Sequence, residues 1–214
     1  MADPKHTEQT ELAKTQEFPA VPSPAQKDDE HFRTEQGRIK EMIAANAPLS
    51  EILSNLVLLI ESQSPEMFCS VLQISADGNH IRHVVAPSLP ESYVKAIDGS
   101  PIGPKHGSCG TAMFRGQPVI VSDVSVDPLW DDYREYAAVA GVHACWSTPI
   151  MSSKGKVLGS FAMYYREPRT PTGAESHLTN VATKLAGLAI EHHASREHAK
   201  VPIIASCFLL LSDY

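Results

Sequence analysis

Apolar residues recur every three or four positions in three stretches of the chain, and this spacing predicts helices. The first stretch runs from Asp28 to the interruption at Pro48 and carries a narrow apolar stripe. The second, residues 49–62, has a broad apolar face that should pack on a sheet. The third, residues 172–200, opens with a capping-box pattern and carries a seam like that of a coiled coil. We expect the narrow stripes of the first and last helices to lie together.

Other stretches alternate apolar and polar residues or are continuously apolar, which is typical of strands. Strands are expected at residues 67–74, 80–85, 119–121, 143–151 and 156–165. The last of them is apolar on both faces and should be a central strand covered on both sides. Shorter helices are expected at 108–115, with Ser108 as N-cap, and from Asp127 to Ala140 before Gly141. The order predicts an α+β fold, in which helices cover both faces of an antiparallel sheet.

The two ends of the chain depart from this pattern. Residues 1–27 hold few apolar side chains and are expected to form a disordered leader. Residues 28–200 then make a single domain. Residues 201–214 are apolar without a period, and Pro202 is expected to end the last helix. Two interpretations of this apolar tail remain open. It could dock on a hydrophobic groove or a dimer partner, or it could be a non-native sequence.

Composition narrows the classes of function. The 214 residues carry a net charge of −7, which argues against general affinity for nucleic acid or anionic membranes. No run of eighteen apolar residues is present, so no membrane-spanning helix is expected. Four widely spaced cysteines without a CxxC pair argue against a structural zinc site or a disulfide framework, and a reducing cytoplasm is the expected compartment.

The candidate chemistry lies between residues 106 and 150, which hold two of the four cysteines and both tryptophans. Cys109 lies near the start of a helix, where the helix dipole favours a thiolate, although a small buried side chain that fills a tight turn is the simpler explanation. The backbone N–H groups of this helix start are also placed to receive an anion. The predicted ligand-binding residues are Ser108, Cys109, Gly110, Asp123, Trp130, Tyr133, Cys145 and Trp146. The alternative role of the aromatic residues is to pack in the core without contacting a ligand. The alternative role of Asp123 is to cap its loop with its carboxylate.

Several local strings resemble the GAF domain, a sensory module related to PAS. They lie at residues 48–53, 107–112, 127–130, 144–150 and 157–162. They are most similar to the subgroup found in bacterial sensor histidine kinases and cyclic-di-GMP signalling proteins. The resemblance implies a six-stranded antiparallel sheet with a pocket on one face and a homodimer formed through the terminal helices. It also implies an unidentified small-molecule ligand and signal transfer to an output domain. No such domain follows Lys200, so either the output lies on a separate protein, such as a histidine kinase, or the chain is a stand-alone or truncated sensor.

One enzyme, free methionine-(R)-sulfoxide reductase, shares this fold and has a cysteine in a Gly-x-Cys-Gly-Thr-Ala string that Cys109 matches. That enzyme uses two further cysteines, and residues 86–105 and 123–143 contain none. Cys145 lies inside a strand, at a different position. We therefore predict a non-catalytic sensory domain without catalytic residues. A thiol reductase and a ligand-free dimerisation module remain the alternatives.

The sequence gives little support for the cyclic nucleotides, bilins or haem that other members of the family bind. The signature that accompanies cyclic-nucleotide binding is absent, and neither Cys109 nor Cys145 precedes a histidine as a bilin anchor commonly does. Haem would need a pocket histidine, for which His106 and His143 are the candidates, but solvated side chains explain both more simply. No metal site is predicted, and the cofactor stays unassigned.

Overall fold

The computed structural model describes residues 23–209, in which five strands form one antiparallel sheet. Their order across the sheet is β2-β1-β5-β4-β3. The bounds are β1 Met67–Ile74, β2 Ile81–Val85, β3 Val119–Val121, β4 Ala144–Met151 and β5 Val157–Tyr165. The central strand β5 pairs with both β1 and β4 along its length, as its two apolar faces predict.

The resemblance implied a sixth strand, and the described part of the chain has five. Residues 99–102 run along the free edge of β2, where the N–H of Ile81 donates to the carbonyl of Ser100 at 2.8 Å. The pairing amounts to one isolated bridge, between His80 and Pro101. Because proline has no N–H, Pro101 cannot extend the ladder into a regular strand.

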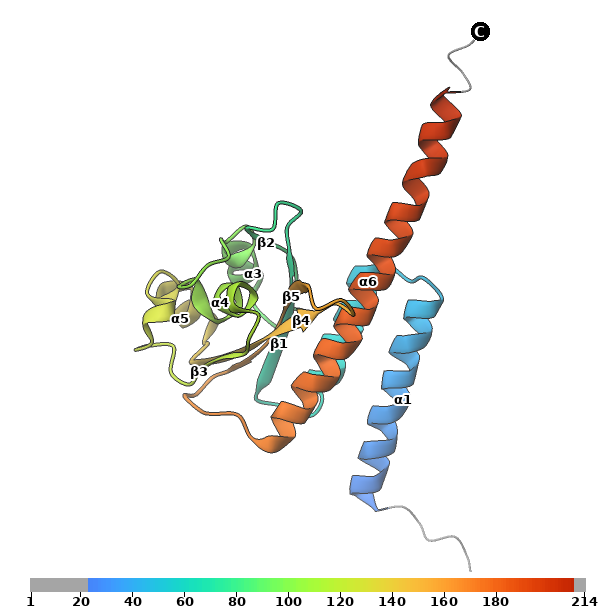
Figure 1. Cartoon of the computed structure of the whole chain (residues 1–214). Coiled ribbons are helices and arrows are strands. Elements are labelled where there is room, and N and C mark those ends of the chain that lie inside the picture. Colours follow the sequence, from blue (N-terminus) through green and yellow to red (C-terminus); the bar gives the residue numbers. More distant parts are fainter. Residues whose placement is uncertain (1–22, 210–214) are drawn as a thin grey trace, which may run out of the picture.

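Three long helices lie on one face of the sheet (Figure 1). They are α1 Pro24–Ala44, α2 Leu49–Glu61 and α6 Gly173–Leu209. The apolar stripe of α1 is buried at Ile39 and Ile43, in one core with α2, α6 and the sheet. The C-terminal end of α1 is also tied to α6, since the side chains of Asn46 and His192 are 2.8 Å apart. The predicted association of the first and last helices is confirmed.

Short helices cover the opposite face of the sheet (Figure 1). They are α3 Glu91–Ile97, α4 Gly107–Arg115, the 3-10 helix η1 Pro128–Trp130 and α5 Arg134–Ala140. Together with alternate residues of the sheet they enclose a second core. The helix predicted from Asp127 to Ala140 is therefore divided into η1 and α5. Its ends are as predicted: the Asp127 carboxylate accepts from the N–H of Leu129, and Gly141 stops α5 in a left-handed conformation.

The first helix begins earlier than the sequence indicated. Ser23 caps α1 through a reciprocal pair, in which its hydroxyl accepts from the N–H of Gln26 and its own N–H donates to the Gln26 side chain. Residues 24–27 are thus helical rather than part of a disordered leader. The rest of that leader, residues 1–22, lies outside the described residues.

The prediction that Pro202 ends the last helix is wrong, because α6 continues to Leu209. A proline inside a helix removes one backbone N–H and strains the preceding turn, but the turns on either side keep their own hydrogen bonds. Most of the predicted apolar tail is therefore helical, and residues 210–214 lie outside the described part. Among the described helices, none has the length and apolar character needed to cross a bilayer.

Candidate functional site

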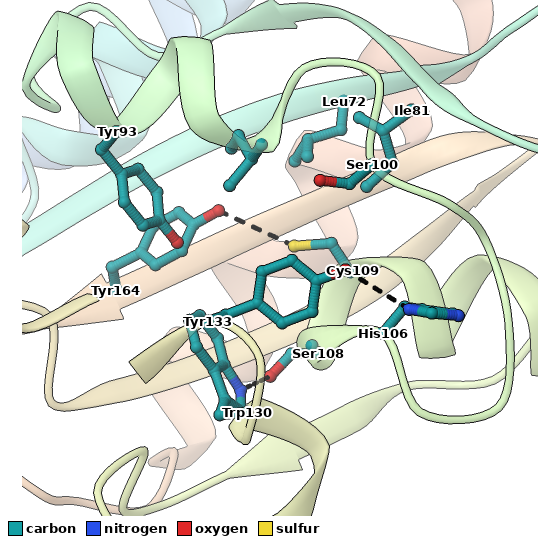
Figure 2. Close-up of a pocket in the computed structure, with 12 residues that line it drawn as sticks. Leu72, Ile81, Tyr93, Ser100, His106, Ser108, Cys109, Trp130, Tyr133 and Tyr164 are labelled. Carbon is teal, nitrogen blue, oxygen red and sulfur yellow. Dashed lines mark hydrogen bonds between the residues drawn. The ribbon is translucent and has the colours of Figure 1, made fainter. Parts of the chain in front are cut away.

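A cavity of about 30 Å³ lies between the start of α4 and the sheet (Figure 2). A space of this size holds one or two water molecules. Its wall is formed by Leu72, Ile81, Tyr93, Ile97, Ser100, His106, Gly107, Ser108, Cys109, Trp130, Tyr133 and Tyr164. Four of the eight predicted ligand-binding residues are among them, and the structure brings these four together from three separate elements.

The start of α4 is shaped by two glycines. Gly107 has a positive φ of 58°, which favours glycine over any residue with a side chain. Gly110 is not in the cavity wall; a Cβ added there would lie 2.9 Å from the carbonyl oxygen of Pro101. These glycines allow the helix to approach the neighbouring loop closely and so aim Cys109 at the cavity.

Ser108 is not the N-cap that the sequence predicted. His106 occupies the cap position, and no side chain caps the helix. The Ser108 hydroxyl instead donates to the carbonyl of Cys145 at 3.1 Å and accepts from the indole N–H of Trp130 at 3.0 Å. The serine is buried, and it joins α4 to β4 and η1 because these two partners satisfy its hydroxyl there.

The thiol of Cys109 occupies the centre of the site. Its hydrogen bond with the Cys145 thiol lowers the pKa of Cys109 to about 7, although burial acts in the opposite direction. The hydroxyls of Ser147, Tyr164 and Ser160 also lower it. Burial, and then the neighbouring Cys109, raise the pKa of Cys145 well above its ordinary value. Of the two thiols, Cys109 is therefore the one that ionises first.

Polar groups surround Cys109 on the sheet side. The Tyr164 hydroxyl is 3.7 Å from the Cys109 sulfur and 2.9 Å from the hydroxyl of Ser70. The buried hydroxyls of Ser147 and Ser160 have no other regular hydrogen-bond partner among the described residues. A buried hydroxyl without a hydrogen bond costs free energy of folding. We therefore interpret these two hydroxyls as donors to a Cys109 sulfur that carries negative charge.

His106 and Tyr133 form the wall on the side of the cavity away from the sheet (Figure 2). The Tyr133 hydroxyl is 3.4 Å from Nδ1 of His106, a long contact for a hydrogen bond. Tyr133 is half-buried, and its ring also meets Trp130 edge to face, with centroids 6.4 Å apart. This wall is held less firmly than the sheet side.

Three other predicted residues lie away from the cavity wall. Cys145 is fully buried in β4, in the core that the short helices cover. The Asp123 carboxylate accepts from the N–H and hydroxyl of Ser125, which is the loop cap that the sequence left open. Trp146 points to the opposite face of the sheet and belongs to the core under the long helices. Neighbouring residues of a strand face opposite ways, so Cys145 and Trp146 cannot share one pocket.

Sequence reasoning missed two tyrosines that line the cavity. Tyr93 and Tyr164 are both fully buried and meet edge to face, with ring centroids 6.0 Å apart. The signal was present in the sequence, since Tyr164 alternates with Ser160 and Ala162 on one face of an expected central strand. A tyrosine in a core needs a partner for its hydroxyl, and this should have marked the polar side of the site.

A second polar cluster joins β5 to α6 on the opposite face. The buried carboxylate of Glu175 accepts from the hydroxyl of Tyr165 at 2.6 Å and from the Arg169 guanidinium at 2.8 Å. It also accepts from the N–H and hydroxyl of Thr172, which completes the predicted capping box. The Arg169 guanidinium lies over the Tyr165 ring, 4.3 Å from its centroid. Within residues 23–209, no group of three His, Cys, Asp or Glu side chains is placed to hold a metal ion.

Comparison with known proteins identifies the domain. The GAF domain profile matches residues 48–190. The methyl sulfide methyltransferase-associated sensor of Methanosarcina acetivorans is 39% identical over 166 residues, which are 78% of this chain and 17% of the relative. This chain thus spans about a sixth of the length of that relative.

Solved structures show the same fold at low identity. A domain described as part of a two-component sensor histidine kinase of Sinorhizobium meliloti is 20% identical, with a TM-score of 0.57 over 70% of this chain and 95% of that one. The free methionine-R-sulfoxide reductase of Neisseria meningitidis, in complex with its substrate, is 15% identical, with a TM-score of 0.60. The match covers 84% of this chain and 97% of that chain. At these identities the similarity establishes the fold alone.

Proposed function

The chain belongs to the GAF domain family, and from that premise we propose that it is a non-catalytic sensory domain. In this proposal a small molecule binds in the cavity beside Cys109, and its binding changes the arrangement of α1, α2 and α6. The predicted contacts are those that line the cavity, Ser108, Cys109, Trp130 and Tyr133. The sensor-named relative from Methanosarcina acetivorans supports the sensory part of the proposal.

The observation that carries the proposal is the position of two adjacent tyrosines on β5. Tyr164 lines the cavity, and Tyr165 faces the long helices, where its hydroxyl donates to Glu175 at the start of α6. Adjacent strand residues share one backbone, so a ligand that shifts Tyr164 also shifts Tyr165. Packed elements resist continuous deformation, and a small shift of β5 therefore favours a discrete change in the seating of α6.

The long helices provide the output side of the proposal. Leu58 on α2 and Leu188 on α6 remain about half exposed, at 49% each, although they lie on helices whose other faces form a core. We expect a second copy of the chain to pack along these helices and a separate output protein, such as a histidine kinase, to respond to them. The fold neighbour from a sensor histidine kinase of Sinorhizobium meliloti favours that kind of partner. We expect a cytoplasmic location, because the buried cysteines Cys69, Cys109 and Cys145 are free thiols.

A cavity-filling variant tests ligand binding. Ile97 lines the cavity and is buried, so Ile97→Phe should occupy the space, whereas Val139, 80% exposed on α5, accepts Val139→Phe without touching it. We expect native mass spectrometry and a thermal-shift screen of small polar metabolites to detect a molecule bound to the wild-type chain and to Val139→Phe, but not to Ile97→Phe. Binding that survives in Ile97→Phe places the ligand elsewhere. A wild-type chain without ligand that still forms a dimer in ultracentrifugation supports the dimerisation module instead.

The thiol reductase keeps one specific observation in its favour, the lowered pKa of Cys109. Assays with free methionine-(R)-sulfoxide, thioredoxin and thioredoxin reductase separate it from the sensor. We expect no turnover above that of the Cys109→Ser variant. Turnover by the wild-type chain that Cys109→Ser abolishes would replace the sensory proposal with the enzymatic one.

A further inference from the structure

We propose that Cys109 and Cys145 are a redox-active pair, which a hydroperoxide entering the cavity converts into a reversible disulfide between α4 and β4. This site does not depend on the small-molecule ligand proposed above. It also differs from the reductase pattern, in which the partner cysteines lie in loops at other positions of the chain.

The placement of the two thiols is the first support. Cys109 lines the cavity and retains 8% exposure, whereas Cys145 is fully buried in β4. Both side chains belong to the same buried core, and each thiol shifts the pKa of the other. The Ser108 hydroxyl, bonded to the carbonyl of Cys145, holds the start of α4 against this point of β4. One sulfur is thus open to a small reagent from the cavity, and the second is buried at the point of β4 against which the start of α4 is held.

The polar surroundings are the second, independent support. Ser147 and Ser160 are 1% and 0% exposed, and their hydroxyls have no regular partner among the described residues. The Tyr164 hydroxyl lies 3.7 Å from the Cys109 sulfur, and all three hydroxyls lower the pKa of Cys109. Hydroxyl donors stabilise a thiolate more than a neutral thiol, so a charged sulfur satisfies groups that a thiol leaves unpaired. A purely structural cysteine in an apolar core needs no such surroundings.

Cys69 supplies an internal contrast. It is also a fully buried free cysteine, but it lies on the other face of the sheet, in the core beneath the long helices. Burial, and then the neighbouring Glu61 carboxylate, raise the pKa of its thiol. We therefore expect Cys69 to be inert under conditions that oxidise Cys109.

The reaction balances as a two-electron oxidation of two thiols by one hydroperoxide. The Cys109 thiolate attacks the terminal peroxide oxygen and breaks the O–O bond. This gives a sulfenic acid on Cys109 and an alkoxide or hydroxide, which takes up a proton and leaves as alcohol or water. The Cys145 sulfur then attacks the Cys109 sulfur, forms the S–S bond and releases water, while its proton is transferred to the departing oxygen. An external dithiol reverses the process by exchange.

The disulfide changes the cavity as well as the thiols. It withdraws the Cys109 sulfur from the wall and removes it as a partner of the Tyr164 hydroxyl. It also fixes α4 covalently to β4, the strand that pairs with β5. Oxidation therefore acts on the same strand that the proposed ligand signal uses.

The test is peroxide treatment of the full chain in a Cys207→Ser background, which removes the cysteine of the C-terminal segment. We expect stoichiometric hydrogen peroxide to lower the intact mass by about 2 Da, the loss of two hydrogens. Peptide mapping without reduction should show the peptides of Cys109 and Cys145 linked, and dithiothreitol should restore the original mass. Cys69 should remain alkylatable after denaturation.

Two variants separate the steps. Cys145→Ser should stop at the sulfenic acid, seen as a gain of about 16 Da that dimedone traps on Cys109. Cys109→Ser should leave Cys145 unoxidised, and circular dichroism checks that both variants are folded. If either variant does not fold, the peptide map of the oxidised parent decides the matter. A parent that forms no Cys109–Cys145 link, or that oxidises at Cys69 first, would overturn the proposal without affecting ligand binding.

Discussion

Replacing Glu175 with glutamine is expected to reduce the free energy of unfolding by about 3 kcal/mol. Glu175 is 8% exposed, and its carboxylate accepts four hydrogen bonds, two on each oxygen. Glutamine keeps one acceptor oxygen and turns an N–H₂ group towards the other two donors. Two hydrogen bonds to a charged group are then lost, each worth about 1.5 kcal/mol or more.

The loss has a thermal and a pH signature. For a domain of this size, about 3 kcal/mol lowers Tm by roughly 6 to 12 °C. Burial opposes ionisation of Glu175, but the hydrogen bonds from Tyr165 and Thr172 and the charge of Arg169 outweigh it and lower its pKa from the ordinary value of 4.5. A folded pKa below the unfolded one gives stability that is fully present above pH 4.5 and disappears as the pH falls through the folded pKa. The difference between wild type and Glu175→Gln should therefore shrink in acid.

Urea unfolding followed by circular dichroism measures this difference at pH 7 and at several values below 4.5. Glu66→Gln is the matched control, since Glu66 pairs with the same Arg169 at 3.9 Å while its side chain is 78% exposed. We expect it to cost less than about 1 kcal/mol. Equal destabilisation by the two variants, or a Glu175→Gln effect that persists unchanged in acid, would refute the role assigned to the buried carboxylate.

Four further substitutions have defined outcomes. Gly107→Ala, at a φ of 58°, should cost about 1 to 2 kcal/mol in urea unfolding, whereas Gly37→Ala in open space within α1 should gain up to about 1 kcal/mol. Gly187→Ala puts a Cβ 2.8 Å from a backbone carbonyl of β4, so we expect a loss of about 1 to 3 kcal/mol and faster hydrogen exchange in α6. Tyr164→Phe removes one of the hydroxyls that lower the pKa of Cys109, and the midpoint of iodoacetamide alkylation at Cys109 should move to higher pH; an unchanged midpoint contradicts that assignment.

Most of the secondary structure follows from the period of the apolar residues. The long helices and the five strands have strong patterns, and their predicted bounds differ from the observed ones by a few residues at most, apart from the ends of α1 and α6. The errors arise where local rules compete. Pro202 is accommodated in α6 because the hydrogen bonds of the helical turns on both sides contribute more stability than the one lost bond removes. Pro101 prevents a regular sixth strand because it removes a backbone N–H at the free edge of β2.

The site was predictable only in part. The helix start with Ser108 and Cys109 and the nearby aromatic residues could be placed near one pocket, because glycine-rich strings and strand ends mark it. Which residues face the pocket depends on strand alternation, and that rule already separates Cys145 from Trp146. The contact between Cys109 and Cys145 depends on the packing angle of α4 on β4, which no local pattern encodes.

The size of the cavity links the two proposals. Ligand pockets usually enclose about 300 Å³ or more, so a molecule larger than water needs a wall to move. Trp130 and Tyr164 are held by buried hydrogen bonds, whereas Tyr133 is half-buried and the contact of its hydroxyl with His106 is long, at 3.4 Å. Movement of Tyr133 opens the cavity at the lowest cost and leaves Cys109 exposed to whatever enters. A bound ligand then covers the sulfur that a hydroperoxide must reach, and oxidation withdraws that sulfur from the ligand. If both proposals hold, ligand binding and oxidation compete for one wall, and both reach the start of α6 through β5, directly for the ligand and through the pairing of β4 with β5 for the disulfide.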